Sequence, residues 1–144
     1  MNLDHSIYHD LIIKATPQQV YRAVSQPNHI NNWWTLRCSG EPALGSEYNF
    51  YFSEEHDWFG EVTNAAEFQS FHIKMTRTDP DWEPTSFGFD IEPHKEGVLL
   101  RFWHVGWPAN NHHFRRSSYI WARLLTGLTN YIEKGIVLPF EERE

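Results

Sequence analysis

The chain has a single cysteine, no long apolar run and few basic side chains, and each shortage excludes a class of protein. Cys38 alone cannot form a disulfide within the chain, which fits a reducing compartment, and we expect it to be a small, part-buried side chain. No stretch approaches the roughly 18 apolar residues of a membrane helix, and the first six residues lack the basic and apolar regions of a leader. We therefore expect a cytoplasmic protein without a membrane span.

Basic residues are outnumbered, with 12 Lys and Arg against 19 Asp and Glu and a formal net charge of −7. A phosphate-rich partner is repelled by such a chain unless a local basic patch overcomes the mean field. The only basic pair, Arg115 and Arg116, is expected at the solvated start of the last helix. We therefore expect no nucleic-acid partner.

Aromatic residues, in contrast, are abundant: the 144 residues include 7 Trp, 6 Tyr and 10 Phe. A chain of this length is expected to form one domain, residues 1–144, which buries about two-thirds of its unfolded surface. That core needs fewer rings than the sequence supplies. We therefore expect some of the rings to line a pocket or an interface.

Alternation of apolar and polar residues predicts a sheet with two short helices after its first strand. Thr16 and Pro17 are typical of a helix start, and Asn28 is a candidate cap for a second short helix that ends at Trp33 or Trp34. The strands are expected at 7–14, 48–52, 58–65, 68–76, 87–91 and 98–105.

The last helix is the strongest single feature. Apolar residues recur at helical spacing over residues 112–134, and Gly135 follows as a stop signal. At 1.5 Å per residue this helix is about 33 Å long, roughly the width of the whole domain. The expected fold is therefore α+β, a curved antiparallel sheet wrapped around the C-terminal helix, which packs on the concave face through Trp121, Leu125 and Leu128.

Several segments in this order resemble the START-like (SRPBCC) superfamily, most closely the branch related to the activator of the heat-shock-chaperone ATPase. They are residues 15–24, Trp33 and Trp34, residues 97–106, and residues 119–135. The resemblance implies a helix-grip fold of about 6–7 strands with an apolar cavity between sheet and helix. Ile120, where many relatives have glycine, and the doubled tryptophan are expected to reshape that cavity. Members of the superfamily carry lipids or plant hormones, cyclise polyketides or bind a chaperone, so the resemblance leaves the function open.

Motifs of the common catalytic classes are absent. The nine histidines form no metal-ligand spacing, so no metal or other cofactor is expected. Ser46, Ser117 and Ser118 lie outside any strand-to-helix nucleophile elbow, and there is no glycine-rich phosphate loop.

His104 shares the predicted inner face of its strand with apolar residues. Three roles stay open: a core histidine, a polar anchor for a ligand, or an acid–base group with a partner such as Glu61. Leu99, Trp103 and Val105 alternate onto the opposite face, where a second copy of the chain is the expected cover.

The leading hypothesis is that the protein binds a small apolar or aromatic molecule without catalysis, held by one or two hydrogen bonds from His104, Tyr48 or Tyr119. The alternatives are a chaperone-binding module and a polyketide cyclase or dehydratase-like enzyme. The cavity candidates are Trp33, Trp34, Tyr48, Phe50, Phe52, Phe71, Ile73, Met75, Phe87, Phe89, Phe102, His104, Tyr119, Trp121 and Leu125.

Overall fold

The computed structural model describes residues 5–144, so most of the segment considered for a leader, residues 1–4, lies outside the described residues. Seven strands form one sheet in the order β1-β7-β6-β5-β4-β3-β2, and every neighbouring pair is antiparallel. The strands are β1 (His5–Ile13), β2 (Arg37–Ser39), β3 (Glu47–Ser53), β4 (His56–Ala66), β5 (Ser70–Arg77), β6 (Ser86–His94) and β7 (Gly97–Trp107). The fold is α+β, of the helix-grip type.

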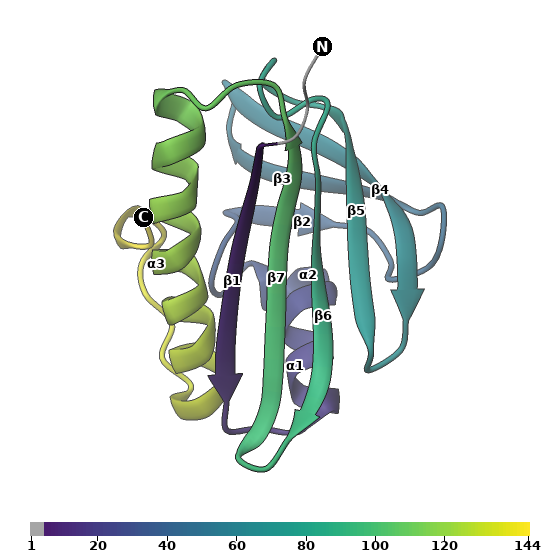
Figure 1. Ribbon diagram of the computed structural model, residues 1–144, viewed down its shortest axis with the longest axis vertical. Coiled ribbons are helices and arrows are strands. Elements are labelled where there is room, and N and C mark those ends of the chain that lie inside the picture. Colours follow the sequence, from purple (N-terminus) through teal and green to yellow (C-terminus); the bar gives the residue numbers. More distant parts are fainter. Residues whose placement is uncertain (1–4) are drawn as a thin grey trace.

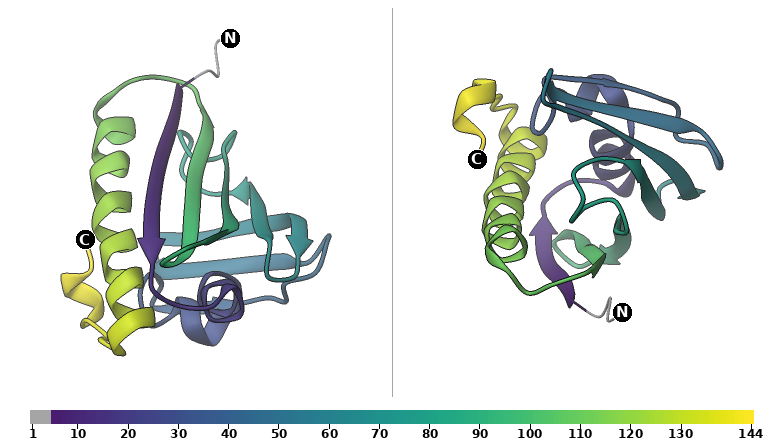
Figure 2. Two further views of the ribbon diagram at one scale, coloured as in Figure 1. Left: turned by 60° about the horizontal axis from the view of Figure 1, so that its bottom comes forward. Right: turned by 90° about the horizontal axis from the view of Figure 1, so that it is seen from above.

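Helices occupy the open side of the curved sheet (Figures 1 and 2). The short helices α1 (Pro17–Ser25) and α2 (Pro27–Ile30) connect β1 to β2, and the long helix α3 (His112–Lys134) follows β7 and runs beside β1. A 3-10 turn, η1 (Phe140–Glu142), lies near the C-terminus. None of the helices in residues 5–144 is both long and apolar enough to cross a membrane.

Side-chain alternation directs one face of each central strand into the core, as the sequence predicts. In β7, Val98, Leu100, Phe102 and His104 are buried, whereas Arg101 between them is exposed. The register places Phe89 of β6 opposite Phe102 and brings inward residues of neighbouring strands side by side. The inner face of the sheet is therefore continuous, with aromatic and aliphatic side chains interleaved.

The predicted caps Thr16 and Gly135 are confirmed, whereas the predicted cap Asn28 is wrong, because α2 begins at Pro27, with Gln26 as its N-cap. Thr16 accepts a hydrogen bond from the backbone N–H of Gln19, whose side chain in turn accepts one from the Thr16 backbone N–H. The α3 helix begins after Asn111, which caps the N–H of Phe114, and ends where Gly135 takes φ of 70°. The predicted bounds of this helix, 112–134, are confirmed.

Four details differ from the expectation. The strand β2 was not predicted, because three residues at a sheet edge are too short to show alternation. β5 begins at Ser70 rather than at residue 68, since Phe68 takes φ of 64° in the preceding turn. α2 begins at Pro27 and ends at Ile30, with residues 31–34 in a turn. The η1 turn was also not predicted.

His104 is fully buried, and both of its ring nitrogens have partners. Its Nδ1 accepts a hydrogen bond from Trp121 Nε1 at 3.0 Å, so the ring proton lies on Nε2, which donates to Thr85 Oγ1 at 2.8 Å. Thr85 Oγ1 donates to the carbonyl of Trp82 at 2.5 Å. A buried polar chain therefore joins α3, β7 and the loop before β6.

Burial of α3 against the sheet gives a stability prediction. Leu128→Asp places an unpaired carboxylate at a position that is 0% exposed, so the free energy of unfolding should fall by about 4 kcal/mol. Thr126→Asp adds the same charge on the exposed side of the helix and should change stability by only about 0.5 kcal/mol. Chemical denaturation of both variants measures the difference. Equal stability of the two would contradict the packing of α3.

A second prediction concerns pH. Burial, with the nearby His113 adding to the effect, lowers the pKa of His104 to about 3, whereas an unfolded histidine titrates near 6.5. The unfolded chain therefore binds the proton first, and the stability that neutral His104 contributes is lost as the pH falls from about 6.5 towards 3. Between about pH 6 and pH 4, the free energy of unfolding should fall by about 1 kcal/mol per pH unit more steeply than that of His104→Gln. Parallel slopes in urea titrations would contradict the neutral, buried imidazole.

Candidate functional site

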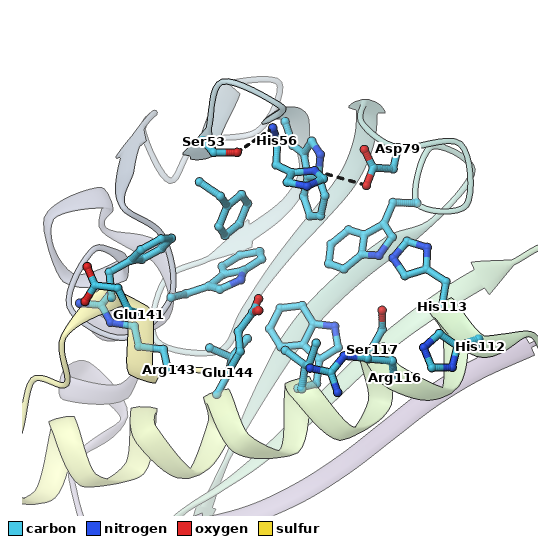
Figure 3. A pocket seen from close by; sticks show the side chains of 18 residues that line it. Ser53, His56, Asp79, His112, His113, Arg116, Ser117, Glu141, Arg143 and Glu144 are labelled. Atoms are coloured by element: carbon cyan, nitrogen blue, oxygen red, sulfur yellow. Dashed lines mark hydrogen bonds and ion pairs between the residues drawn. The ribbon is translucent and has the colours of Figure 1, made fainter.

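A pocket of about 560 Å³ opens between the sheet and α3 (Figure 3). Its walls come from β3, β4, the β5–β6 loop, the turn after α2, the first half of α3 and the C-terminal segment. The lining residues are Trp34, Phe52, Ser53, His56, Trp58, Asp79, Trp82, His112, His113, Arg116, Ser117, Ile120, Trp121, Leu124, Phe140, Glu141, Arg143 and Glu144.

Five of the lining side chains form a closed ring of aromatic contacts. Phe52 contacts Trp58 with ring centroids 5.0 Å apart, and Trp58 contacts Trp82 at 4.5 Å. Trp82 lies 6.1 Å from Trp121, Trp121 lies 4.9 Å from Trp34, and Trp34 lies 5.6 Å from Phe52. We call these five residues the aromatic ring of the pocket. It offers flat apolar surfaces of the kind that bind apolar and aromatic ligands.

Polar side chains surround the aromatic ring (Figure 3). On the sheet side, His56 Nδ1 lies 3.6 Å from Asp79 Oδ2. On the α3 side, His113 Nδ1 lies 3.2 Å from Asp81 Oδ2, and Arg116 has no ion pair or hydrogen bond among residues 5–144. Ser117 is 6% exposed, and its hydroxyl likewise has no partner among these residues.

The C-terminal segment after α3 forms a third wall, and Arg143 anchors it. The Arg143 Nη1 atom donates to the carbonyls of Asn31 at 2.8 Å and Thr35 at 3.1 Å, and its Nε donates to the carbonyl of Leu138. These bonds satisfy carbonyl groups beyond the end of α2. The anchored segment carries Glu144, whose side chain extends into the pocket in Figure 3.

Three of the predicted cavity residues line this pocket: Trp34, Phe52 and Trp121. Most of the others are buried elsewhere in the core, namely Trp33, Tyr48, Phe50, Phe71, Ile73, Met75, Phe87, Phe89, Phe102, His104 and Leu125. Among them Trp33 donates to the Ala23 carbonyl at 2.8 Å, and Tyr48 donates to the Ser25 carbonyl at 2.5 Å. Tyr119 is 56% exposed and lies outside the pocket wall.

The two groups considered for acid–base chemistry, His104 and Glu61, lie outside the pocket. His104 is separated from it by the ring contacts with Trp82 and Trp121, and Glu61 is exposed on β4. Burial raises the pKa of the Cys38 thiol to about 12, so the thiol stays protonated at neutral pH. Within residues 5–144 no group of three or more His, Cys, Asp or Glu side chains is placed to hold a metal ion.

Sequence reasoning did not assign the polar residues of the pocket, or its Trp58 and Trp82, to a ligand site. Trp58 begins a predicted strand and Trp82 lies in the loop between two strands, so neither stood out by inward parity. The only sequence signal for these two residues was the excess of tryptophan. In the structure, the indole N–H groups of both are buried without a partner among residues 5–144.

Comparisons with known proteins support the fold. The family model described as Activator of Hsp90 ATPase homolog 1-like protein matches residues 14–133. Similar solved structures include the Aha1 dimer from Colwellia psychrerythraea, at 26% identity over 91% of this chain and 98% of that chain with a TM-score of 0.83. MLL2253 from Mesorhizobium loti is 18% identical over 92% of this chain and 100% of that chain, with a TM-score of 0.80. CalU16 from Micromonospora echinospora is 17% identical over 90% of this chain and 76% of that chain, with a TM-score of 0.69.

The two structures below 25% identity establish the fold alone. A search of curated proteins finds no significant match. The family model spans most of the sequence, in agreement with the resemblance drawn from its motifs. The chain therefore belongs to the Activator of Hsp90 ATPase homolog 1-like protein family.

Proposed function

We propose that the protein binds a small apolar or aromatic molecule in the pocket between the sheet and α3, without catalysing a reaction on it. The observation that carries the proposal is the aromatic ring of Trp34, Phe52, Trp58, Trp82 and Trp121 on the wall of a pocket of about 560 Å³. A pocket of this size falls in the range of small-molecule sites.

The expected affinity follows from the buried area. An apolar ligand that buries about 300 Å² gains roughly 7 kcal/mol before ordering costs. Because those costs remove part of the gain, we expect a Kd of about 100 µM for a simple two-ring compound. Binding of a neutral ligand should depend on fit and only weakly on salt.

Filling the pocket tests the proposal. Ile120 lines the pocket, so Ile120→Trp should weaken binding of 2-naphthylacetamide at least about tenfold, because the added indole occupies the space of the ligand. Ala122→Trp adds the same side chain on the exposed side of α3 and should bind like the unchanged protein. Isothermal titration calorimetry avoids interference from the added tryptophan. If both variants bind equally well, or if no apolar compound binds the unchanged protein, the proposal fails.

Self-association is a second candidate property. Tyr8 pairs with Trp103 and Ile12 pairs with Leu99 across β1 and β7, so two pairs of large apolar side chains lie on the outer face of the sheet, with Asp10 and Arg101 between them. Tyr8 is 70% exposed and Ile12 is 43% exposed. The structure from Colwellia psychrerythraea, 26% identical to this chain, is described as a dimer. These observations support a homodimer through this face.

Sedimentation velocity at a protein concentration of about 50 µM tests the dimer. Tyr8→Glu should shift the protein towards monomer, because a buried, unpaired carboxylate opposes burial of the face. Leu44→Glu changes a residue that is 76% exposed in the loop between β2 and β3, away from that face, and should leave the dimer intact. A monomeric unchanged protein at this concentration would overturn the proposed dimer.

No contact in the described residues favours either of the other two hypotheses, a chaperone partner, as named in the family's description, or a polyketide-like substrate.

A further inference from the structure

One side of the pocket collects hydrogen-bond donors that have no acceptor. Ser117 is the clearest case: its side chain is 6% exposed, and its hydroxyl points from α3 into the pocket (Figure 3). Two other hydroxyls in the same helix bond back to the preceding turn: Thr126 to the Ala122 carbonyl at 2.9 Å and Thr129 to the Leu125 carbonyl at 3.0 Å. Ser117 has no such bond among the described residues, so its hydroxyl is available to a ligand.

Two indole groups of the aromatic ring also carry unpaired donors, but these are buried. The Nε1 atoms of Trp58 and Trp82 are buried and have no hydrogen-bond partner within residues 5–144. An indole N–H can only donate, and a buried donor left unpaired costs about 1–3 kcal/mol. Both side chains line the pocket, and Trp82 is 5% exposed. Because both nitrogens are covered by the protein, as is the likewise unpaired Nε1 of Trp107 outside the pocket wall, the donors open to a ligand are those of Ser117 and Arg116.

Charge at the same side of the pocket favours an anionic acceptor. Arg116 precedes Ser117 on α3 and has no carboxylate partner among the described residues. Of the nearby carboxylates, Asp79 faces His56 and Asp81 faces His113, whereas Glu141 and Glu144 line the pocket from the C-terminal segment. Arg116 and Ser117 lie in the second turn of the 23-residue helix, so the helix dipole, which acts within the first turn, adds little to the attraction of Arg116 for an anion.

We propose that the ligand is an apolar or aromatic carboxylic acid, with its carboxylate at Arg116 and Ser117 and its apolar body on the aromatic ring. This inference rests on the proposed binding function and names its ligand class. Glu144 enters the pocket from the C-terminal segment, so the carboxylate of the ligand is directed away from it, towards the start of α3.

Three probes of one shape test the ligand class: 2-naphthylacetate, 2-naphthylacetamide and 2-(2-naphthyl)ethylamine. We expect the carboxylate to bind about tenfold more tightly than the neutral amide, because charge-assisted hydrogen bonds are roughly twice as strong as neutral ones. The preference should shrink with added salt, since Arg116 is exposed. Tighter binding of the amine would overturn the proposal and point to a cationic ligand held by the rings and Glu144.

Matched variants locate the interaction. Arg116→Gln should remove most of the preference for the carboxylate over the amide, whereas Ser117→Ala should weaken both probes about threefold. Arg115→Gln is the control, since Arg115 is exposed in the same turn, lies outside the pocket wall and bonds to Asn110 Oδ1 at 2.9 Å. Glu144→Gln should tighten carboxylate binding about twofold by removing a like charge.

The outcomes separate this inference from the function on which it rests. If the amide binds and the carboxylate binds no better, or if Arg115→Gln and Arg116→Gln act alike, the ligand class is wrong and the apolar pocket stands. If none of the three probes binds, the proposed function itself fails. Circular dichroism of each variant establishes that the fold is retained before the affinities are compared.

Discussion

The hydrogen bond from Trp121 to His104 is the interaction on which the remaining architecture depends. It joins the long helix to the central strand β7 in a fully buried setting. Because His104 Nδ1 accepts this bond, the ring proton of His104 lies on Nε2. His104 Nε2 donates to the Thr85 hydroxyl, which in turn donates to the carbonyl of Trp82. Each group in the chain is satisfied, so the network orients the helix, the sheet and the loop before β6 at once. An apolar residue in place of His104 would leave the Trp121 N–H unpaired.

The pocket is an extension of this core rather than a separate structure. Trp121 and Trp82 are held from behind by the buried network, and their opposite surfaces form part of the pocket wall. Rings supported in this way lose little freedom when a ligand binds, so the aromatic ring is preorganised. The C-terminal wall has its own support, because Arg143 ties it to carbonyls of Asn31 and Thr35, more than 100 residues away in sequence.

Sequence patterns predicted the fold well because alternation and caps are local signals. The inward parity of β6 and β7 and the cap residues around α3 are readable without knowledge of any partner element. The pocket was harder to predict, because parity separates inward from outward residues but does not say whether an inward ring meets another ring or a void. Phe87 and Phe52 both face inward by pattern, yet the first is buried among rings and the second lines the pocket. The Arg143 contacts join distant segments with no periodicity, so no local pattern announces them.

The proposed ligand class also suggests a physical way for one fold to acquire different preferences. The buried network behind it is electrically neutral, because burial holds the pKa of His104 far below neutral pH. Under the proposal, discrimination between ligands therefore arises at the polar lining residues, which include Arg116, Ser117 and Glu144. A field of this kind orients a ligand by its polar end, and the rings retain it by area. Because these polar residues contribute little to the core, they can change without loss of the fold, and the same helix-grip architecture can accept ligands of different charge.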